Sequence, residues 1–433
     1  MNYYSLTGQS PQVDFKEATI RGQAPDKGLY FPESIPEIES SFFENINQFS
    51  KDEIAYRVIL PYVGDAIPSA DLKKIISETI NFDFPLVPVT EHIYSLELFH
   101  GPTLAFKDVG ARFMSRCMGY FTANNNKQIT VLVATSGDTG GAVASGFYGV
   151  EGVKVVILYP SGKVSEVQEL QLTTMGKNIS ALEMDGSFDD CQQLVKQAFA
   201  DTDLNREIFL TSANSINVAR WLPQQFYYFF AYQQWADKMT PPVISVPSGN
   251  FGNICAGLLA HRSGLPVRHF IAACNANDVI PSYLTNGNYQ PKKAKATLSN
   301  AMDVGDPSNF VRVLELFQQK FDAIRKSMSS YSFSDEETKN VIRQVYKDHR
   351  YVLDPHGAVG YLALEKYLLR FPEEKGIFLE TAHPVKFYDA VQPVILNKIQ
   401  APDSVQALLN RKKKRIKMAV SYESLRDYLL TTR

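Results

Sequence analysis

The chain has 433 residues, 45% of them hydrophobic and 21% charged, and a formal net charge of -2. A chain of this length exceeds what one hydrophobic core usually holds, so we expect at least two domains. The composition is that of a globular enzyme rather than a disordered chain. With 44 Lys and Arg against 46 Asp and Glu, the charge balance argues against nucleic acid or an anionic membrane as a partner.

The four cysteines show no CxxC spacing, which excludes a disulfide framework and a Cys-built zinc site and favours a reducing cytoplasm. The first residues, MNYYSLTGQS, lack the charged and apolar regions of a signal peptide. The apolar runs are far shorter than the ~20 residues that span a bilayer. We therefore expect a cytoplasmic protein without a membrane partner or a metal site.

Residues 1–85 contain many turn signals but no Gly-rich turn between a strand and a helix. They predict an accessory N-terminal domain. At the other end, residues 396–433 form a C-terminal extension that carries the basic run RKKKRIK at 411–417. An isolated basic run in an otherwise acidic chain is more typical of a solvated helix or tail than of a nucleic-acid site.

Residues 86–395 alternate short β-branched runs with helical patterns, which indicates an α/β fold with parallel sheets covered by helices on both faces. A capping box at Ser165 and Gln168 and a cap at Ser187 predict two helix starts. We expect one long helix over 217–236. The expected strands are Ile129–Ala134, Val153–Tyr159, Ile179–Met184, Ile208–Thr211, Val243–Val246, His269–Cys274 and Gly376–Glu380.

Ligands of such sheets bind where strands end and helices begin, and the first such turn leads to Lys107. The sequence LFHGPTLAFKD places Lys107 at the start of a predicted helix, beside Phe106. The helix dipole and burial both lower the pKa of a lysine, and a neutral amine can attack an aldehyde. The alternative is a surface lysine near a helix cap.

Two Gly-rich turns follow other predicted strands. TSGDTGG at 135–141 offers backbone N–H groups and hydroxyls to an anion such as a carboxylate. SGNFGN at 248–253 offers a nest for a phosphate, and it matches neither a P-loop nor GxGxxG. Each of these turns is also compatible with an ordinary capped turn.

The strand Gly376–Glu380 ends in the sequence ETAHP, which supplies a hydroxyl at Thr381 and an imidazole at His383. His383 is a candidate base, although a structural histidine at a helix start is more common. Taken together, these turns provide an amine, a phosphate nest, an anion nest and a hydroxyl. A phosphorylated aldehyde cofactor would use all four groups.

The motifs HGPTLAFKD at 100–108, TSGDTGG, SANSIN at 212–217, SVPSGNFGN at 245–253 and NAMDV at 300–304 resemble those of the threonine synthase family in its longer form. The resemblance covers nearly the whole chain and keeps the order of the motifs. It implies the pyridoxal-phosphate fold type II (tryptophan synthase β-like), with two parallel-sheet subdomains and the N-terminal accessory domain. The smaller, mobile subdomain would span roughly 110–220.

The resemblance also implies pyridoxal 5′-phosphate on Lys107, with Thr381 opposite its pyridine nitrogen. The cofactor phosphate would lie on Gly249, Asn250, Phe251, Gly252 and Asn253. The substrate carboxylate would lie on Ser136, Gly137, Asp138 and Thr139. The candidates for the substrate phosphate are Asn214, Ser215, Asn217 and Lys163.

The implied reaction converts O-phospho-L-homoserine and water to L-threonine and phosphate in a monomer or homodimer. Many fold type II relatives carry SGNTG at the second turn, whereas here Asp138 is the third residue. The alternatives are another fold type II enzyme of the threonine dehydratase or cysteine synthase kind, or a catalytically silent relative that binds a phosphorylated ligand. A nucleotide-binding oxidoreductase is disfavoured because GxGxxG is missing.

Overall fold

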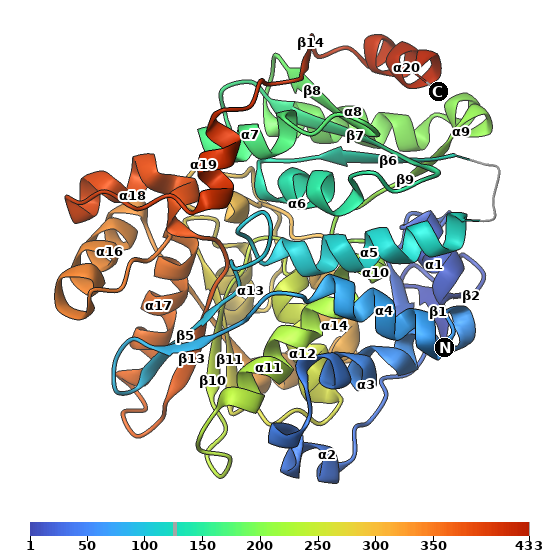
Figure 1. Cartoon of the computed structure of the whole chain (residues 1–433). Helices are drawn as coiled ribbons and strands as arrows, with labels where there is room; N and C mark the ends of the chain where they lie inside the picture. The colour runs from blue at the N-terminus through green and yellow to red at the C-terminus, as the bar shows by residue number, and fades with distance from the viewer. Residues whose placement is uncertain (124–127, 433) are drawn as a thin grey trace. The chain divides into compact units, whose positions relative to one another are not determined.

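The computed structural model describes residues 1–123 and 128–432 and divides the chain into two compact units (Figure 1). Unit 1 comprises Met1, 31–106 and 221–400, and unit 2 comprises 2–30, 107–220 and 401–433. Each unit therefore contains segments from distant parts of the sequence. The division into 1–85, 86–395 and 396–433 follows sequence signals rather than contacts, and it stays a prediction.

Unit 1 is built on a six-stranded sheet of order β12-β11-β10-β13-β5-β4, in which only the edge strand β4 is antiparallel. Its strands are β4 (Leu86–Pro88), β5 (Ile93–Glu97), β10 (Val243–Pro247), β11 (His269–Cys274), β12 (Met328–Ser332) and β13 (Gly376–Glu380).

Helix α17 packs on β10, β11 and β13, with α16 beside it, while α12 contacts β11. From the N-terminal part of the unit, α3 packs on α11. The helices of unit 1 are α2 (Ser40–Glu44), η1 (Ile46–Gln48), α3 (Lys51–Val63), η2 (Gly64–Ala66), α4 (Ser69–Thr79), η3 (Leu222–Gln225), α11 (Phe226–Gln234), α12 (Gly252–Arg262), α13 (Val279–Asn286), η4 (Asn300–Met302), α14 (Phe310–Leu316), α15 (Phe321–Ser327), α16 (Asp335–His349), α17 (Pro355–Leu368), η5 (Pro384–Phe387) and α18 (Tyr388–Ile395).

Unit 2 is built on a five-stranded, all-parallel sheet of order β14-β8-β7-β6-β9. Its strands are β6 (Ile129–Ala134), β7 (Val153–Pro160), β8 (Ile179–Met184), β9 (Phe209–Thr211) and β14 (Ile416–Met418), and β1 (Asn2–Ser5) pairs separately with β2 (Val13–Asp14). The strand β3 (Tyr30–Pro32) lies where the first segment of this unit ends.

Alternate residues of these strands point to opposite faces of the sheet, so Leu132, Leu158 and Leu182 share one core with Leu194 of α8 and Leu425 of α20. Helices α5, α6 and α7 pack against one another in series. The helices of unit 2 are α1 (Phe15–Arg21), α5 (Lys107–Thr122), α6 (Asp138–Phe147), α7 (Glu166–Thr173), α8 (Phe188–Ala200), α9 (Thr202–Glu207), α10 (Val218–Trp221), which ends at the boundary, α19 (Asp403–Leu409) and α20 (Tyr422–Thr431).

The α/β class and the parallel sheets are confirmed, but the single helix expected over 217–236 is wrong. The segment forms α10, then the 3-10 turn η3, then α11. Pro223 lies in the first turn of η3. Because proline has no N–H to donate to the preceding turn, Pro223 removes one hydrogen bond of a continuous α-helix and favours the start of a new turn at this point.

The basic run at 411–417 is exposed, as expected of a solvated segment, but the expected helix or tail is wrong. Ile416–Met418 forms the edge strand β14, which pairs in parallel with β8. Lys413 contacts Glu169 at 2.5 Å, and the Arg415 guanidinium pairs with the carboxylate of Glu183. The run therefore closes one edge of the unit 2 sheet.

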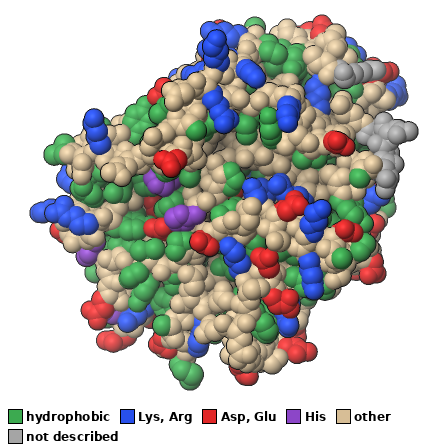
Figure 2. All heavy atoms as spheres, viewed as in Figure 1, with side chains coloured by type: hydrophobic (Ala, Val, Ile, Leu, Met, Phe, Trp, Pro, Cys, Tyr) green, Lys and Arg blue, Asp and Glu red, His purple; other side chains and the backbone are tan. Residues whose placement is uncertain are grey.

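The face of the molecule shown in Figure 2 carries side chains of both charge signs, as the near-neutral net charge leads one to expect. Among the described residues, no helix combines the length and the apolar character needed to cross a membrane.

Candidate functional site

The sheet of unit 1 brings the predicted phosphate loop and Thr381 to neighbouring strand ends. The loop 249–253 follows β10, Thr381 follows β13, and these two strands pair in parallel. Their carboxyl ends therefore lie at the same edge of the sheet, which is where ligands of parallel sheets bind.

The segment that leads to Lys107 is attached to the same edge. Beyond β5, the chain forms an antiparallel bridge between Ala105 and Ala382. The Phe106 N–H donates to the Thr381 carbonyl at 2.9 Å, and the His383 N–H donates to the Leu104 carbonyl at 3.0 Å. Lys107 is the next residue after Phe106, so the hydrogen bond between Phe106 and Thr381 fixes the backbone position immediately before this lysine.

Lys107 is partly buried and is the first residue of α5, as the sequence predicts. The loop before it is held by Lys386, a fully buried residue of η5 whose ammonium group donates to the Thr103 carbonyl at 2.9 Å. Leu104 adopts a positive φ of 58°, a conformation that costs energy for a residue with a Cβ and persists only where the surroundings enforce it. No local pattern indicates the role of Lys386, because its partner Thr103 lies far away in the chain.

The loop 249–253 has the features of an anion site. Helix α12 begins at Gly252, and no side chain caps its N-terminus. The first N–H groups of a helix have no partner within the helix, and they carry its positive dipole end. Phe251, at the cap position, has a positive φ of 62°, which turns the backbone sharply into the helix.

The loop also depends on close backbone packing at Gly249. A Cβ at this position would lie 2.7 Å from both the Ala301 carbonyl oxygen and the Met302 Cα. On the other side, the Asn250 side-chain oxygen accepts hydrogen bonds from the N–H and the hydroxyl of Ser308, each at 2.8 Å. This side-chain oxygen therefore anchors the loop.

An uncapped helix start, a glycine that admits no side chain and a hydroxyl on the next strand suit a phosphorylated aromatic aldehyde. The residues of unit 1 thus fit pyridoxal phosphate. They would hold its phosphate at 249–253 and its ring nitrogen at Thr381, which is 5% exposed.

We expect Gly249→Ala to weaken cofactor retention about 10- to 100-fold, because both atoms that the new methyl meets belong to the backbone and cannot rotate away. Overpacking of this kind costs about 1–3 kcal/mol, and each 1.4 kcal/mol is about tenfold in affinity. Dialysis of the holoprotein measures the loss. Gly119→Ala on α5, where the new methyl meets only a Val150 methyl at 3.3 Å, is the control. Equal retention in both variants would contradict this packing argument.

His383 has a structural position rather than that of a base. Its Nδ1 accepts the Val385 N–H at 3.1 Å and caps η5, and its ring packs edge-on against Phe99. Burial, followed by the nearby His100, lowers the pKa of His383 to about 4. The imidazole is therefore neutral at physiological pH.

Unit 2 places the predicted substrate turns at another set of neighbouring strand ends. The turn 136–139 follows β6, Lys163 follows β7, and 214–217 follows β9. These three strands are adjacent and parallel in the order β7-β6-β9. The sheet therefore brings the three predicted segments to one edge, and Lys163 is exposed there.

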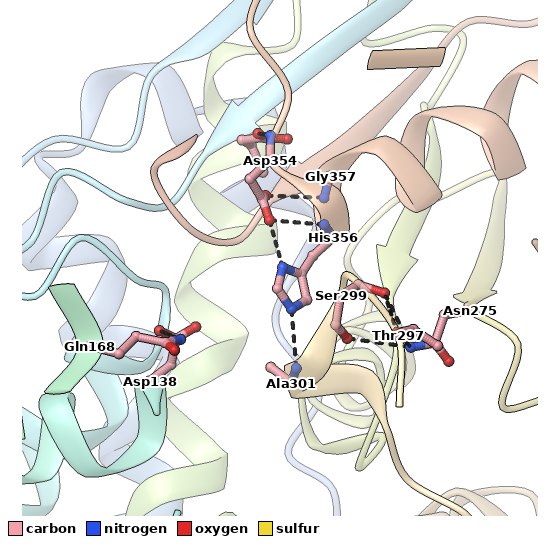
Figure 3. A network of polar contacts seen from close by, with 10 residues as sticks. Asp138, Gln168, Asn275, Thr297, Ser299, Ala301, Asp354, His356 and Gly357 are labelled. Atoms are coloured by element: carbon pink, nitrogen blue, oxygen red, sulfur yellow. Dashed lines mark hydrogen bonds and ion pairs between the residues drawn. The ribbon is translucent and has the colours of Figure 1, made fainter. Parts of the chain in front are cut away.

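The turn 136–139 is held by two side chains. The Thr135 hydroxyl accepts the N–H groups of Gly137 and Gly140 at 2.9 and 2.8 Å. The Gln168 side-chain amide donates to Asp138 at 2.9 Å, as Figure 3 shows. Gly137 has a φ of 135°, and a Cβ on it would lie 2.4 Å from the Gln168 side chain.

Gln168 was predicted only as part of a capping box, which is confirmed. Its additional contact with Asp138 joins residues thirty positions apart, a distance that no local pattern reveals. Asp138, 4% exposed, is held in place by this contact.

The SANSIN residues differ in how much of their side chains is engaged. Asn217 is fully buried, its amide donates to the Thr19 carbonyl at 2.9 Å, and its oxygen accepts the Ala219 N–H. The Asn214 side-chain oxygen, in contrast, is buried and has no hydrogen-bond partner among the described residues. Of these two asparagines, Asn214 thus has the oxygen that a ligand could satisfy.

Three family models match the chain: "Pyridoxal-phosphate dependent enzyme" over residues 86–379, "Threonine synthase N terminus" over 2–80 and "Threonine synthase, C-terminal" over 357–429. The chain is 44% identical to the threonine synthase of Escherichia coli K12 over 93% of both chains. It is 36% identical to that of Saccharomyces cerevisiae over 95% of this chain and 94% of the relative.

Two solved structures that resemble this chain are also threonine synthases. The crystal structure of threonine synthase from Escherichia coli has a TM-score of 0.94 and 41% identity, and all of both chains is covered. The structure of PLP-bound threonine synthase from Brucella melitensis has a TM-score of 0.92 and 35% identity, covering 100% of this chain and 99% of that one. A threonine deaminase from Solanum lycopersicum shares the fold at a TM-score of 0.57, with 13% identity, over 85% of this chain and 94% of that one.

Proposed function

Because this chain belongs to the threonine synthase family of pyridoxal-phosphate dependent enzymes, we propose that it converts O-phospho-L-homoserine and water to L-threonine and phosphate, with Lys107 as the catalytic amine. The single observation that supports this role of Lys107 best is the backbone bond from Phe106 to Thr381. It ties Phe106, the residue before Lys107, to the strand end beside the phosphate loop.

The bound cofactor supplies an electron sink for the substrate carbons. We assign its phosphate to the N–H groups of Gly249, Asn250, Phe251, Gly252 and Asn253, and its ring nitrogen to the Thr381 hydroxyl. A hydroxyl does not force that nitrogen to carry a proton, because it both donates and accepts hydrogen bonds.

With the cofactor bound, the Lys107 amine would hold it and would be released when the substrate binds. The released amine would then remove the proton from the substrate Cα, and a second proton would leave Cβ as phosphate departs from Cγ. A proton would return to Cγ, water would add its hydroxyl to Cβ, and Cα would be reprotonated. One amine can serve several of these proton transfers because it is a base when neutral and an acid once protonated.

The substrate contacts of the proposal come from unit 2. The turn Ser136, Gly137, Asp138 and Thr139 receives the α-carboxylate, with its backbone held by Thr135 and the Asp138 side chain held by Gln168. The substrate phosphate is assigned to Asn214, Ser215 and Lys163. We give Asn217 an indirect part, because its amide already binds Thr19 and Ala219.

The proposed setting is a reducing cytoplasm, and the proposed state is a monomer or homodimer that works without nucleic acid. Four buried cysteines, none in a disulfide, support the first point. The near-neutral net charge supports the absence of a nucleic-acid partner. The mass of the protein in solution decides between monomer and dimer.

The direct test incubates the purified protein, loaded with pyridoxal phosphate, with O-phospho-L-homoserine. Threonine and inorganic phosphate should appear in equal amounts. Formation of a ketoacid from threonine, without consumption of O-phospho-L-homoserine, would instead support the dehydratase alternative. The absence of either reaction in a protein that binds the cofactor would support the silent relative.

A further inference from the structure

A buried histidine of unit 1, His356, contacts the backbone that supports the proposed phosphate loop. It is 2% exposed and lies in the first turn of α17, directly after the cap residue Asp354 and Pro355. Its ring packs on Phe387, with 4.9 Å between ring centroids. The proposed reaction assigns no role to this imidazole.

The two ring nitrogens of His356 have different partners, as Figure 3 shows. The Nε2 atom lies 3.2 Å from the N–H of Ala301, which can only donate. Nε2 must therefore carry the lone pair, and the ring proton lies on Nδ1. Asp354 accepts this proton at 2.5 Å.

Asp354 is itself fixed, so the ring has one orientation. One carboxylate oxygen also accepts the His356 N–H at 2.8 Å, and the other accepts the Gly357 N–H at 3.1 Å. The N–H of Asp354 donates to Glu380, the last residue of β13, at 2.7 Å. The imidazole is thus anchored to the strand that ends beside Thr381.

At its other end, the imidazole holds the turn Asn300–Met302 by its single hydrogen bond to Ala301. The carbonyl oxygen of Ala301 and the Cα of Met302 are the atoms on which Gly249 packs, with no room even for a Cβ. A shift of this turn would therefore move the first residue of the phosphate loop.

We propose that His356 is a positioning residue for cofactor binding: its neutral Nε2 accepts the Ala301 N–H and so holds the Asn300–Met302 turn against Gly249 of the phosphate loop. The inference rests on the proposed function, because it concerns the loop to which we assign the cofactor phosphate. Beyond the reaction itself, it requires that cofactor binding depends on a hydrogen-bond acceptor at the Nε2 position of residue 356.

Two substitutions separate an acceptor role from simple packing. In His356→Asn the side chain can still donate to Asp354 but is too short to reach Ala301. In His356→Gln the longer side chain places an oxygen near the Nε2 position. We expect His356→Asn to weaken the binding of pyridoxal phosphate, and of inorganic phosphate to the apoprotein, about tenfold, because the Ala301 N–H is left unpaired. His356→Gln should remain within about threefold of the wild type.

His269→Asn is the matched control, because His269 is a partly buried histidine of this unit that bonds to Ser329 rather than to the loop support. A second variant, Ala301→Pro, removes the donated N–H and leaves His356 unchanged, and proline is tolerated in the first turn of a helix. The double variant His356→Asn with Ala301→Pro should bind no more weakly than either single variant, because both remove the same hydrogen bond.

The inference is overturned if His356→Asn binds phosphate as well as His269→Asn does. It is also overturned if the double variant loses as much affinity as the losses of His356→Asn and Ala301→Pro added together. Thermal unfolding of the apoprotein shows whether His356→Asn folds. If it does not fold, the phosphate affinities of Ala301→Pro and His356→Gln test the inference instead. A wild-type protein that binds no pyridoxal phosphate would refute the proposed function instead. In that event the inorganic phosphate measurements still decide the role of His356.

Discussion

Replacement of Lys107 by alanine is expected to lower the turnover of O-phospho-L-homoserine by at least about 10³-fold and to abolish the visible absorption band of the bound cofactor. Loss of one general base alone costs roughly 10²–10⁴-fold, and here the same amine also carries the covalent bond to the cofactor. Absorbance spectra and phosphate release, measured on the same preparation, test both parts of this prediction.

The matched control is Lys51→Ala. Lys51 is also the first residue of a helix, α3, and its ammonium group binds the Phe82 carbonyl. Its replacement should leave the band and the turnover unchanged. A Lys107→Ala protein that keeps both would show that another amine holds the cofactor.

The second large effect concerns stability rather than turnover. Glu380 is fully buried, and burial, together with the negative charges of Asp354 and Glu97, raises its pKa well above the usual value. One of its carboxyl oxygens is buried without a hydrogen-bond partner among the described residues, which makes a negative charge on it unfavourable. In the unfolded chain the same group ionises near pH 4.3.

Above that pH the folded protein holds one proton more than the unfolded chain, so its free energy of unfolding falls as the pH rises. The slope is about 1.4 kcal/mol per pH unit until the folded pKa is reached. Glu380→Gln has no proton to hold. We therefore expect the free energy of unfolding of Glu380→Gln, minus that of the wild type, to increase by up to about 1.4 kcal/mol for each pH unit from pH 5 upwards.

Urea unfolding of the apoproteins at pH 5, 6 and 7 measures this difference directly. The control is Glu336→Gln, the same chemical change on an exposed residue of α16. If the wild type and Glu380→Gln show parallel pH profiles, the carboxyl group of Glu380 is ionised in the folded protein.

The parts of the fold that were predictable are those encoded by neighbouring residues. The apolar runs Ile129–Ala134, Ile179–Met184 and His269–Cys274 are strands with the predicted bounds. Because ligand turns follow such strands, the candidate segments could be located without a structure. The capping box at Ser165 and the helix cap at Ser187 were equally local, and both are confirmed.

The remaining features depend on contacts between distant residues. Nothing near Phe106 in the sequence indicates that it bonds to Thr381, and nothing near His356 indicates Ala301. The basic run at 411–417 was misjudged for the same reason, because its partners Glu169 and Glu183 lie more than two hundred residues earlier. Such pairs are set by topology, which local propensity does not encode.

The pairing of β14 with β8 has a consequence for how this protein is made. A ribosome releases the residues of the unit 2 sheet in order, and the edge strand at 416–418 emerges more than two hundred residues after its partner β8. Helix α20, which contributes Leu425 and Leu429 to the same core, follows it. A nascent chain in which β8 has already emerged therefore lacks one border of that sheet and part of its core until residues 416–429 have been made.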